Sequence, residues 1–135
     1  MTALTTDINR IFESPNDSNS VPLAGEVKIY QGALIGLNED GYGQSLEAGD
    51  VAMGFAKDNL DNTDGADGER IADVKAQGKV SLFISGLAID DVGSKVYASD
   101  DNTFTLTATD NSLVGKIVRF EKADYGIVAF DFLNN

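Results

Sequence analysis

The feature that most constrains this chain is the alternation of apolar and polar residues between Gly78 and Phe120. The segments VSLFIS, which starts at Val80, and TFTLTAT, which starts at Thr103, both place apolar side chains at every second position. A two-residue period is the pattern of a half-buried β-strand, and β-branched threonine suits the pleated surface of a sheet. The predicted core consists of Val80, Leu82, Ile84, Phe104, Leu106 and Val118.

Turn-forming residues separate these strand signals along the chain. Asp90–Gly93, Ser99–Asn102 and Asn38–Gly41 combine short polar side chains, which bond to nearby backbone, with residues that tolerate positive φ. Ala33–Leu37 is a continuous apolar run, as expected for a strand buried on both faces. The spacing predicts an all-β fold: a small antiparallel β-barrel or β-sandwich of about nine short strands.

The first 24 residues differ in character from the rest of this 135-residue, single-domain chain. Their apolar residues recur at helical spacing, and Pro15 would end a helix there. The segment is therefore predicted to be a short helix folded back on the body, an arm that is buried only on a partner or neighbouring subunit, or an inert terminus. The β domain is predicted to span residues 25–135. The candidate contacts with a partner or a neighbouring subunit are Leu4, Ile8, Ile11, Phe12, Val21 and Leu23.

Catalytic chemistry finds little support in the composition. Histidine and cysteine are absent, so Ser/His/Asp and Cys/His arrangements, thiolate metal sites and disulfides are excluded. The adjacent pairs Asp90–Asp91 and Asp100–Asp101 lie in turn contexts, and neighbours in extended chain point to opposite sides. The chain is predicted not to be an enzyme and to need no cofactor.

The most acidic segment, Asp58–Glu69, has aspartate at every third position. A calcium loop needs oxygens that converge on one centre in a fixed register, and no register of this segment fits. We interpret it as a solvated loop and leave calcium binding open.

The net charge of −12 repels nucleic acid, so a nucleic-acid partner is not expected. The N-terminus has no signal-peptide pattern, and no apolar run is long enough to span a membrane. We therefore expect a soluble protein that is made in the cytoplasm and has no membrane partner.

One family resemblance covers the chain from about Gly25 to Phe132. The segment DVGSKVYASDDNTFTLT, which starts at Asp91, followed by NSLVGKIV from Asn111, resembles the head-decoration (capsid cement) proteins of tailed bacteriophages. The resemblance implies a β-barrel or β-sandwich that binds the outer surface of the icosahedral head through the major capsid protein, often as a homo-trimer near three-fold positions. It also implies a virion location, a structural role without catalytic or cofactor residues, and an N-terminal arm that contacts the capsid.

Two other functions stay open. A receptor- or glycan-binding β module would be favoured by an exposed aromatic cluster among Tyr30, Tyr42, Tyr97 and Tyr125. The absence of tryptophan weakens a sugar-stacking site. A calcium-stabilised extracellular domain would be favoured by a large thermal stabilisation with calcium but not with magnesium.

Overall fold

The computed structural model describes residues 3–10, 13 and 16–134. Within these residues the chain forms twelve β-strands and one 3-10 turn, η1 (Ile89–Asp91). The predicted all-β class is confirmed. The sheets do not close into barrels, and their arrangement is compatible with a sandwich.

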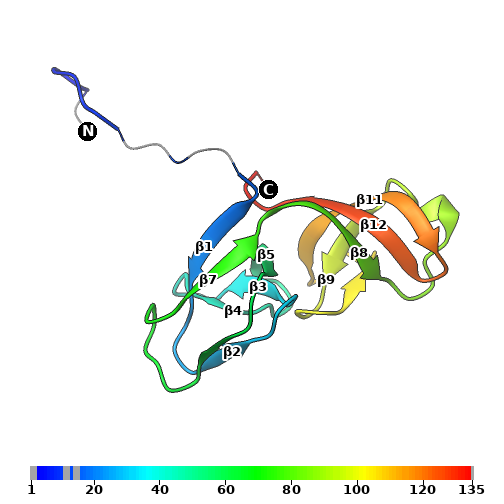
Figure 1. The fold of residues 1–135 in the computed structure, drawn as a ribbon. Helices are drawn as coiled ribbons and strands as arrows, with labels where there is room; N and C mark the ends of the chain where they lie inside the picture. The colour runs from blue at the N-terminus through cyan, green and yellow to red at the C-terminus, as the bar shows by residue number, and fades with distance from the viewer. Residues whose placement is uncertain (1–2, 11–12, 14–15, 135) are drawn as a thin grey trace.

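Two five-stranded antiparallel sheets and a two-stranded ribbon make up the fold (Figure 1). The first sheet has the order β1 (Ser18–Pro22), β7 (Ile71–Lys75), β5 (Val51–Ala56), β3 (Leu34–Leu37), β4 (Gly43–Ser45). The second has the order β10 (Phe104–Thr105), β9 (Lys95–Ala98), β11 (Ser112–Lys122), β12 (Tyr125–Asp131), β8 (Gln77–Phe83). The ribbon pairs β2 (Val27–Ile29) with β6 (Leu60–Asn62). Ala76 alone separates β7 from β8, so the chain passes directly from one sheet to the other.

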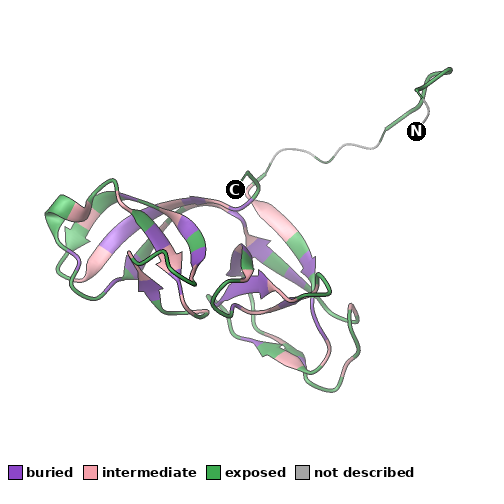
Figure 2. Cartoon of the chain, turned by 180° about the vertical axis from the view of Figure 1, so that it is seen from behind, coloured by how far each residue is buried: buried purple, intermediate pink, exposed green. Residues whose placement is uncertain are grey.

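Two apolar clusters stabilise these sheets, and β3 contributes to both because its side chains alternate in direction. Leu34 belongs to the larger cluster, which contains residues of both sheets. Ile35 belongs to the smaller cluster, which contains residues of the first sheet and of the ribbon. Both side chains are fully buried, and Figure 2 shows buried residues concentrated on the strands. The interpretation of Ala33–Leu37 as a strand buried on both faces is confirmed.

Phe55 of β5 is the main aromatic contact between the two sheets. Its ring centroid lies 5.1 Å from that of Phe130, 6.1 Å from that of Phe132 and 6.3 Å from that of Phe104. Such pairs contribute about 0.5–1.5 kcal/mol each beyond the area they bury. One side chain of the first sheet is thus held by three from the second half of the chain.

Most of the predicted core is correct. Leu82, Ile84 and Phe104 are buried. Val80 and Leu106 are partly buried and pack against the larger cluster. The alternation therefore identified the inward face of β8 and β10.

The prediction that Val118 belongs to the core is wrong, because this side chain is 40% exposed. The pairing of β11 with β12 shifts register between Ile117 and Arg119, which is a β-bulge. A bulge inserts one unpaired residue and interrupts the alternation of faces. Val118 is that extra residue.

The threonine-rich strand is shorter than expected, since β10 covers Phe104–Thr105 rather than 103–109. The backbone N–H of Thr107 donates to Oγ1 of Thr105 at 3.2 Å, and Nδ2 of Asn111 donates to the Thr107 carbonyl at 3.0 Å. These local bonds give the backbone an alternative to the sheet ladder. The strand therefore ends at Thr105, where these local hydrogen bonds begin.

The sheet domain begins at Ser18, not at residue 25 as expected from the sequence. β1 pairs with β7 over its whole length, from Ser18 opposite Lys75 to Pro22 opposite Ile71. Because β1 is an edge strand, Pro22 costs no interior hydrogen bond. The arm is therefore shorter than the predicted 24 residues.

Candidate docking surfaces

The described part of the N-terminal arm, residues 3–10, forms no helix or strand and is exposed throughout. It lies away from both sheets (Figure 1). Leu4 is 65% exposed and Ile8 is 54% exposed, and neither belongs to an apolar cluster. The other two predicted arm contacts, Ile11 and Phe12, lie outside the described residues. The described arm therefore presents two large apolar side chains that its own body does not bury.

The last two predicted contacts, Val21 and Leu23, are in a different position. Their side chains are 2% and 0% exposed, and both belong to the smaller cluster. Val21 lies on β1, and the backbone N–H of Leu23 donates to the Arg70 carbonyl at 2.8 Å. They stabilise the first sheet from within, so the arm contacts that the structure leaves accessible are Leu4 and Ile8.

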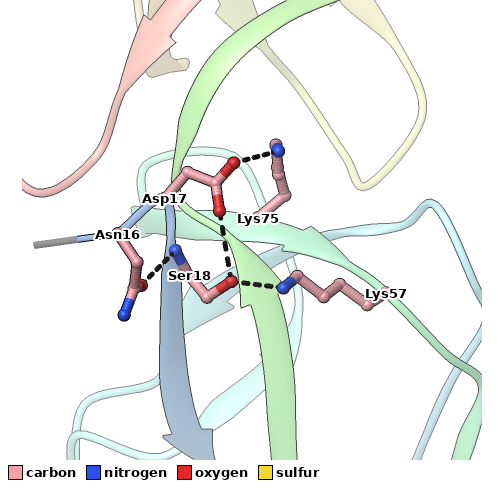
Figure 3. Close-up of polar contacts among 5 residues, drawn as sticks. All are labelled: Asn16, Asp17, Ser18, Lys57 and Lys75. Atoms are coloured by element: carbon pink, nitrogen blue, oxygen red, sulfur yellow. Dashed lines mark hydrogen bonds and ion pairs between the residues drawn. The ribbon is translucent and has the colours of Figure 1, made fainter. Parts of the chain in front are cut away.

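Polar contacts fix the point where the arm joins the body (Figure 3). The Asp17 carboxylate forms an ion pair with Nζ of Lys75, and Nζ of Lys57 donates to Oγ of Ser18. The Ser18 hydroxyl also donates to Asp17 at 3.4 Å, and its backbone N–H donates to Oδ1 of Asn16 at 2.8 Å. We call these five residues the arm anchor: it attaches the start of β1 to β5 and β7 and defines where the arm begins.

The arm anchor depends on pH through Asp17. The hydrogen bond from Lys75 lowers the pKa of this carboxyl below its ordinary value of 3.8. A lowered pKa in the folded state means that the charged form stabilises the fold above the unfolded-state pKa. This contribution is lost as the pH falls through the lowered value, because protonation removes the charge that Lys75 binds.

The two carboxylate pairs serve turns, as the sequence predicted. Oδ2 of Asp91 accepts the backbone N–H of Ala88 at 2.9 Å. Oδ1 of Asp100 accepts the N–H of Asn102 at 2.8 Å, and this bond lowers the pKa of Asp100. Both aspartates are engaged in local backbone geometry.

The acidic segment Asp58–Glu69 contains β6 and a loop whose carboxylates bond locally. Oδ1 of Asp61 accepts from the hydroxyl of Thr63 at 2.6 Å, and this bond lowers the pKa of Asp61. Oδ1 of Asp67 accepts the N–H of Gly25 at 2.8 Å. Among the described residues, no three acidic side chains are grouped so as to hold a metal ion. Calcium binding stays an untested alternative.

Asn62 stabilises this loop and was not identified from the sequence. It is 1% exposed, and its Nδ2 donates to the carbonyls of Ala24 at 2.7 Å and Ala66 at 3.2 Å. Its Oδ1 has no hydrogen-bond partner and lies where a Cβ on Gly65 would come within 1.9 Å. The Asn–Thr–Asp–Gly sequence signals a turn, but nothing in it signals that the amide is buried.

The tyrosines do not gather in one aromatic cluster within the described residues. Tyr125 packs against Phe83 with a centroid distance of 5.4 Å. Tyr30 is 62% exposed, and Nζ of Lys28 lies 5.2 Å from its ring centroid. No ring contact joins any two of the four tyrosines in the part of the chain that the structure describes. This distribution gives little support to a glycan-binding platform.

Comparison with known proteins identifies no relative: no family model, no curated protein and no solved structure matches the chain. In the described residues, no helix has the length and apolar character needed to cross a membrane.

Proposed function

We propose that this chain is a capsid decoration protein that binds the outer surface of an icosahedral phage head and stabilises it without catalysis. One observation carries the proposal: the folded β domain is preceded by an arm whose Leu4 and Ile8 are exposed and belong to neither apolar cluster among the residues that the structure describes. Exposed single apolar residues are ordinary, but these two share a segment that packs on neither sheet. The resemblance of residues 25–132 to decoration proteins gives the class of partner, the major capsid protein.

Stabilisation follows from mass action. A protein that binds the assembled shell but not its separated subunits shifts the equilibrium toward the shell. Each arm contact needs only modest affinity, because a homo-trimer engages several capsid subunits at once and gains avidity. The net charge of −12 favours the solubility of free copies.

The arm anchor has a role in this mechanism. The Lys75–Asp17 ion pair and the Lys57–Ser18 hydrogen bond hold the base of the arm against the first sheet. A fixed base limits the conformations that binding must restrict, and a lower ordering cost leaves more of the contact free energy as affinity.

The test replaces the apolar arm residues while leaving β1 intact. The variant L4D/I8D is expected to lose co-sedimentation with undecorated heads, because two carboxylates would have to be desolvated at an apolar contact. T5D/N9D is the matched control, since it adds the same charge to exposed polar positions of the same segment. The control should bind nearly as wild type.

A deletion through residue 24 would not test the proposal cleanly, because it removes β1 and three buried core residues, Val21, Leu23 and Ala24. Undiminished binding by L4D/I8D would show that residues 3–10 are not the contact. Equal loss in both variants would show that added negative charge, not the loss of apolar side chains, prevents binding. Either outcome would contradict the assignment of the contact to Leu4 and Ile8.

A further inference from the structure

The outer face of the second sheet carries a row of lysines. Lys116 on β11 lies opposite Lys95 on β9 and, on its other side, opposite Ala129 on β12. Ala129 in turn lies opposite Lys79 on β8. Residues directly opposite in register share a face of the sheet, so the three lysines and Ala129 form one row across four strands.

This row is the centre of a basic surface on an acidic protein. The strands of the second sheet hold five cations, Lys79, Lys95, Lys116, Arg119 and Lys122, against two acids, Glu121 and Asp131. Like charges directly opposite each other destabilise a sheet, and Lys95 and Lys116 stand in that relation. Within the described residues the one ion pair is Lys75–Asp17, so no lysine of the row is ion-paired, although Asp131 lines the same groove as Lys95 and Lys116.

Apolar surface lies beside the lysines. A groove of about 340 Å³ is lined by Leu113 and Ala129 together with Lys95 and Lys116. Leu113 is 40% exposed, as is Val118 on the bulge of β11. A cationic rim around an apolar floor is the composition of a protein-docking surface, and it requires a partner that is acidic.

We propose that this face docks the Asp58–Glu69 loop of a second copy of the chain. The loop carries five carboxylates and no cation, and Asp58 and Asp64 in it are exposed. Its charge complements the lysine row. The loop lies at the opposite end of the molecule from the second sheet, so the two surfaces cannot meet within one copy (Figure 1).

Two different surfaces make the contact head to tail. Such contacts close into a ring when the rotation between copies allows it and otherwise extend into a filament. Repulsion between copies of charge −12 acts over distance and is screened at physiological ionic strength, where the Debye length is about 8 Å. Charge pairs in direct contact are screened less. This contact does not require that the chain bind a shell.

The experiment uses two reversed variants of the full chain and measures sedimentation velocity over a range of concentrations and salt. K95E/K116E reverses the face, and D58K/D64K reverses the loop. Each alone should lower self-association by at least about tenfold, because like charges at an interface cost several kcal/mol. An equal mixture should associate again, since each variant then offers the complement of the other. Wild-type association should weaken as salt is raised above the physiological range, where the repulsion between copies is already screened and the contact pairs become screened as well.

The matched control is T5D/N9D/R10E, which changes three exposed arm positions outside both docking surfaces and gives the same net charge as K95E/K116E. It should associate as strongly as wild type. Circular dichroism and thermal melting verify that each variant is folded. A monomeric wild type at physiological salt, a mixture that fails to associate, or an equal loss in the control would each overturn the proposal.

Retained self-association of K95E/K116E combined with loss of binding to undecorated heads would also overturn it, and would assign the face to the shell. The proposal is supported if K95E/K116E loses self-association while L4D/I8D self-associates as strongly as wild type. Failure of the arm variants to alter head binding bears on the proposed function alone.

Discussion

One strand of the first sheet and one of the second differ in how their two faces are buried. In the first sheet, β3 sends Leu34 into one cluster and Ile35 into the other, and both are fully buried. In the second sheet, β12 sends Val128 into the larger cluster, while Ala129 lies on the outer face with the lysines. β3 is therefore structural on both sides, whereas β12 has one side at the surface at this position. The difference indicates which positions of this chain tolerate change.

The largest expected effect is in the first sheet. Ile35→Ala removes a fully buried side chain and should lower the free energy of unfolding by about 2–5 kcal/mol. Val118→Ala, on the exposed bulge of the second sheet, should change it by less than about 0.5 kcal/mol. Urea denaturation of both variants measures the contrast. Similar losses would contradict the described difference in burial between Ile35 and Val118.

Gly115 is a backbone position of the second sheet that tolerates little change. A Cβ on Gly115 would lie 2.0 Å from the Ala129 carbonyl oxygen, so Gly115→Ala must push β11 away from β12. We expect a loss of about 1–3 kcal/mol, as for other overpacked sites. The neighbouring exposed position supplies the control, because Lys116→Ala should cost less than about 0.5 kcal/mol. A neutral Gly115→Ala would mean that the two strands pair less closely than described.

Asn62 tests whether the acidic loop depends on a buried amide. Asn62→Ala removes the donors to Ala24 and Ala66 and should cost about 1–3 kcal/mol. Asn111→Ala removes one bond at the surface and should cost less. Thermal unfolding of the two variants compares them. If Asn62→Ala is the milder change, the loop is held by other contacts.

The smallest effect concerns the arm anchor. Asp17→Asn should reduce stability slightly at neutral pH, because the ion pair with Lys75 is half exposed. The pKa of Asp17 is lowered in the folded protein, so the wild type should lose this contribution as the pH falls below 3.8. The Asp17→Asn variant should lose less stability than the wild type over the same pH range. Parallel pH profiles of stability for the two proteins would rule out the described role of Asp17.

Much of this fold was predictable because period-2 alternation and turn residues are local signals. Leu82, Ile84 and Phe104 were identified as core from their spacing alone. Bulges were not predictable: β11 and β12 are consecutive strands, but the alternation along β11 does not reveal that its register against β12 shifts at Val118. The short β10 likewise depends on side-chain bonds of Thr105 and Asn111 that compete with the ladder.

The candidate docking surfaces were predictable only in part. Leu4 and Ile8 were candidate contacts on a segment for which a helix folded back on the body, a partner-bound arm and an inert terminus were all left open, and both are exposed. Val21 and Leu23 were grouped with them, although both lie in the smaller cluster. Val21 lies opposite Ala72, and Leu23 bonds to the Arg70 carbonyl, both far along the chain, so no local pattern could reveal the burial. The lysine row was not predictable for the same reason, since its members come from four strands that only the fold brings together.

The central claim is that this chain binds an assembled phage head. Its most direct test mixes the wild-type protein with purified undecorated heads and measures co-sedimentation over a range of protein concentrations. We predict saturation at a fixed number of copies per head, together with a higher temperature of head disruption. Protein that stays in the supernatant at every concentration, or binding that never saturates, would contradict the claim.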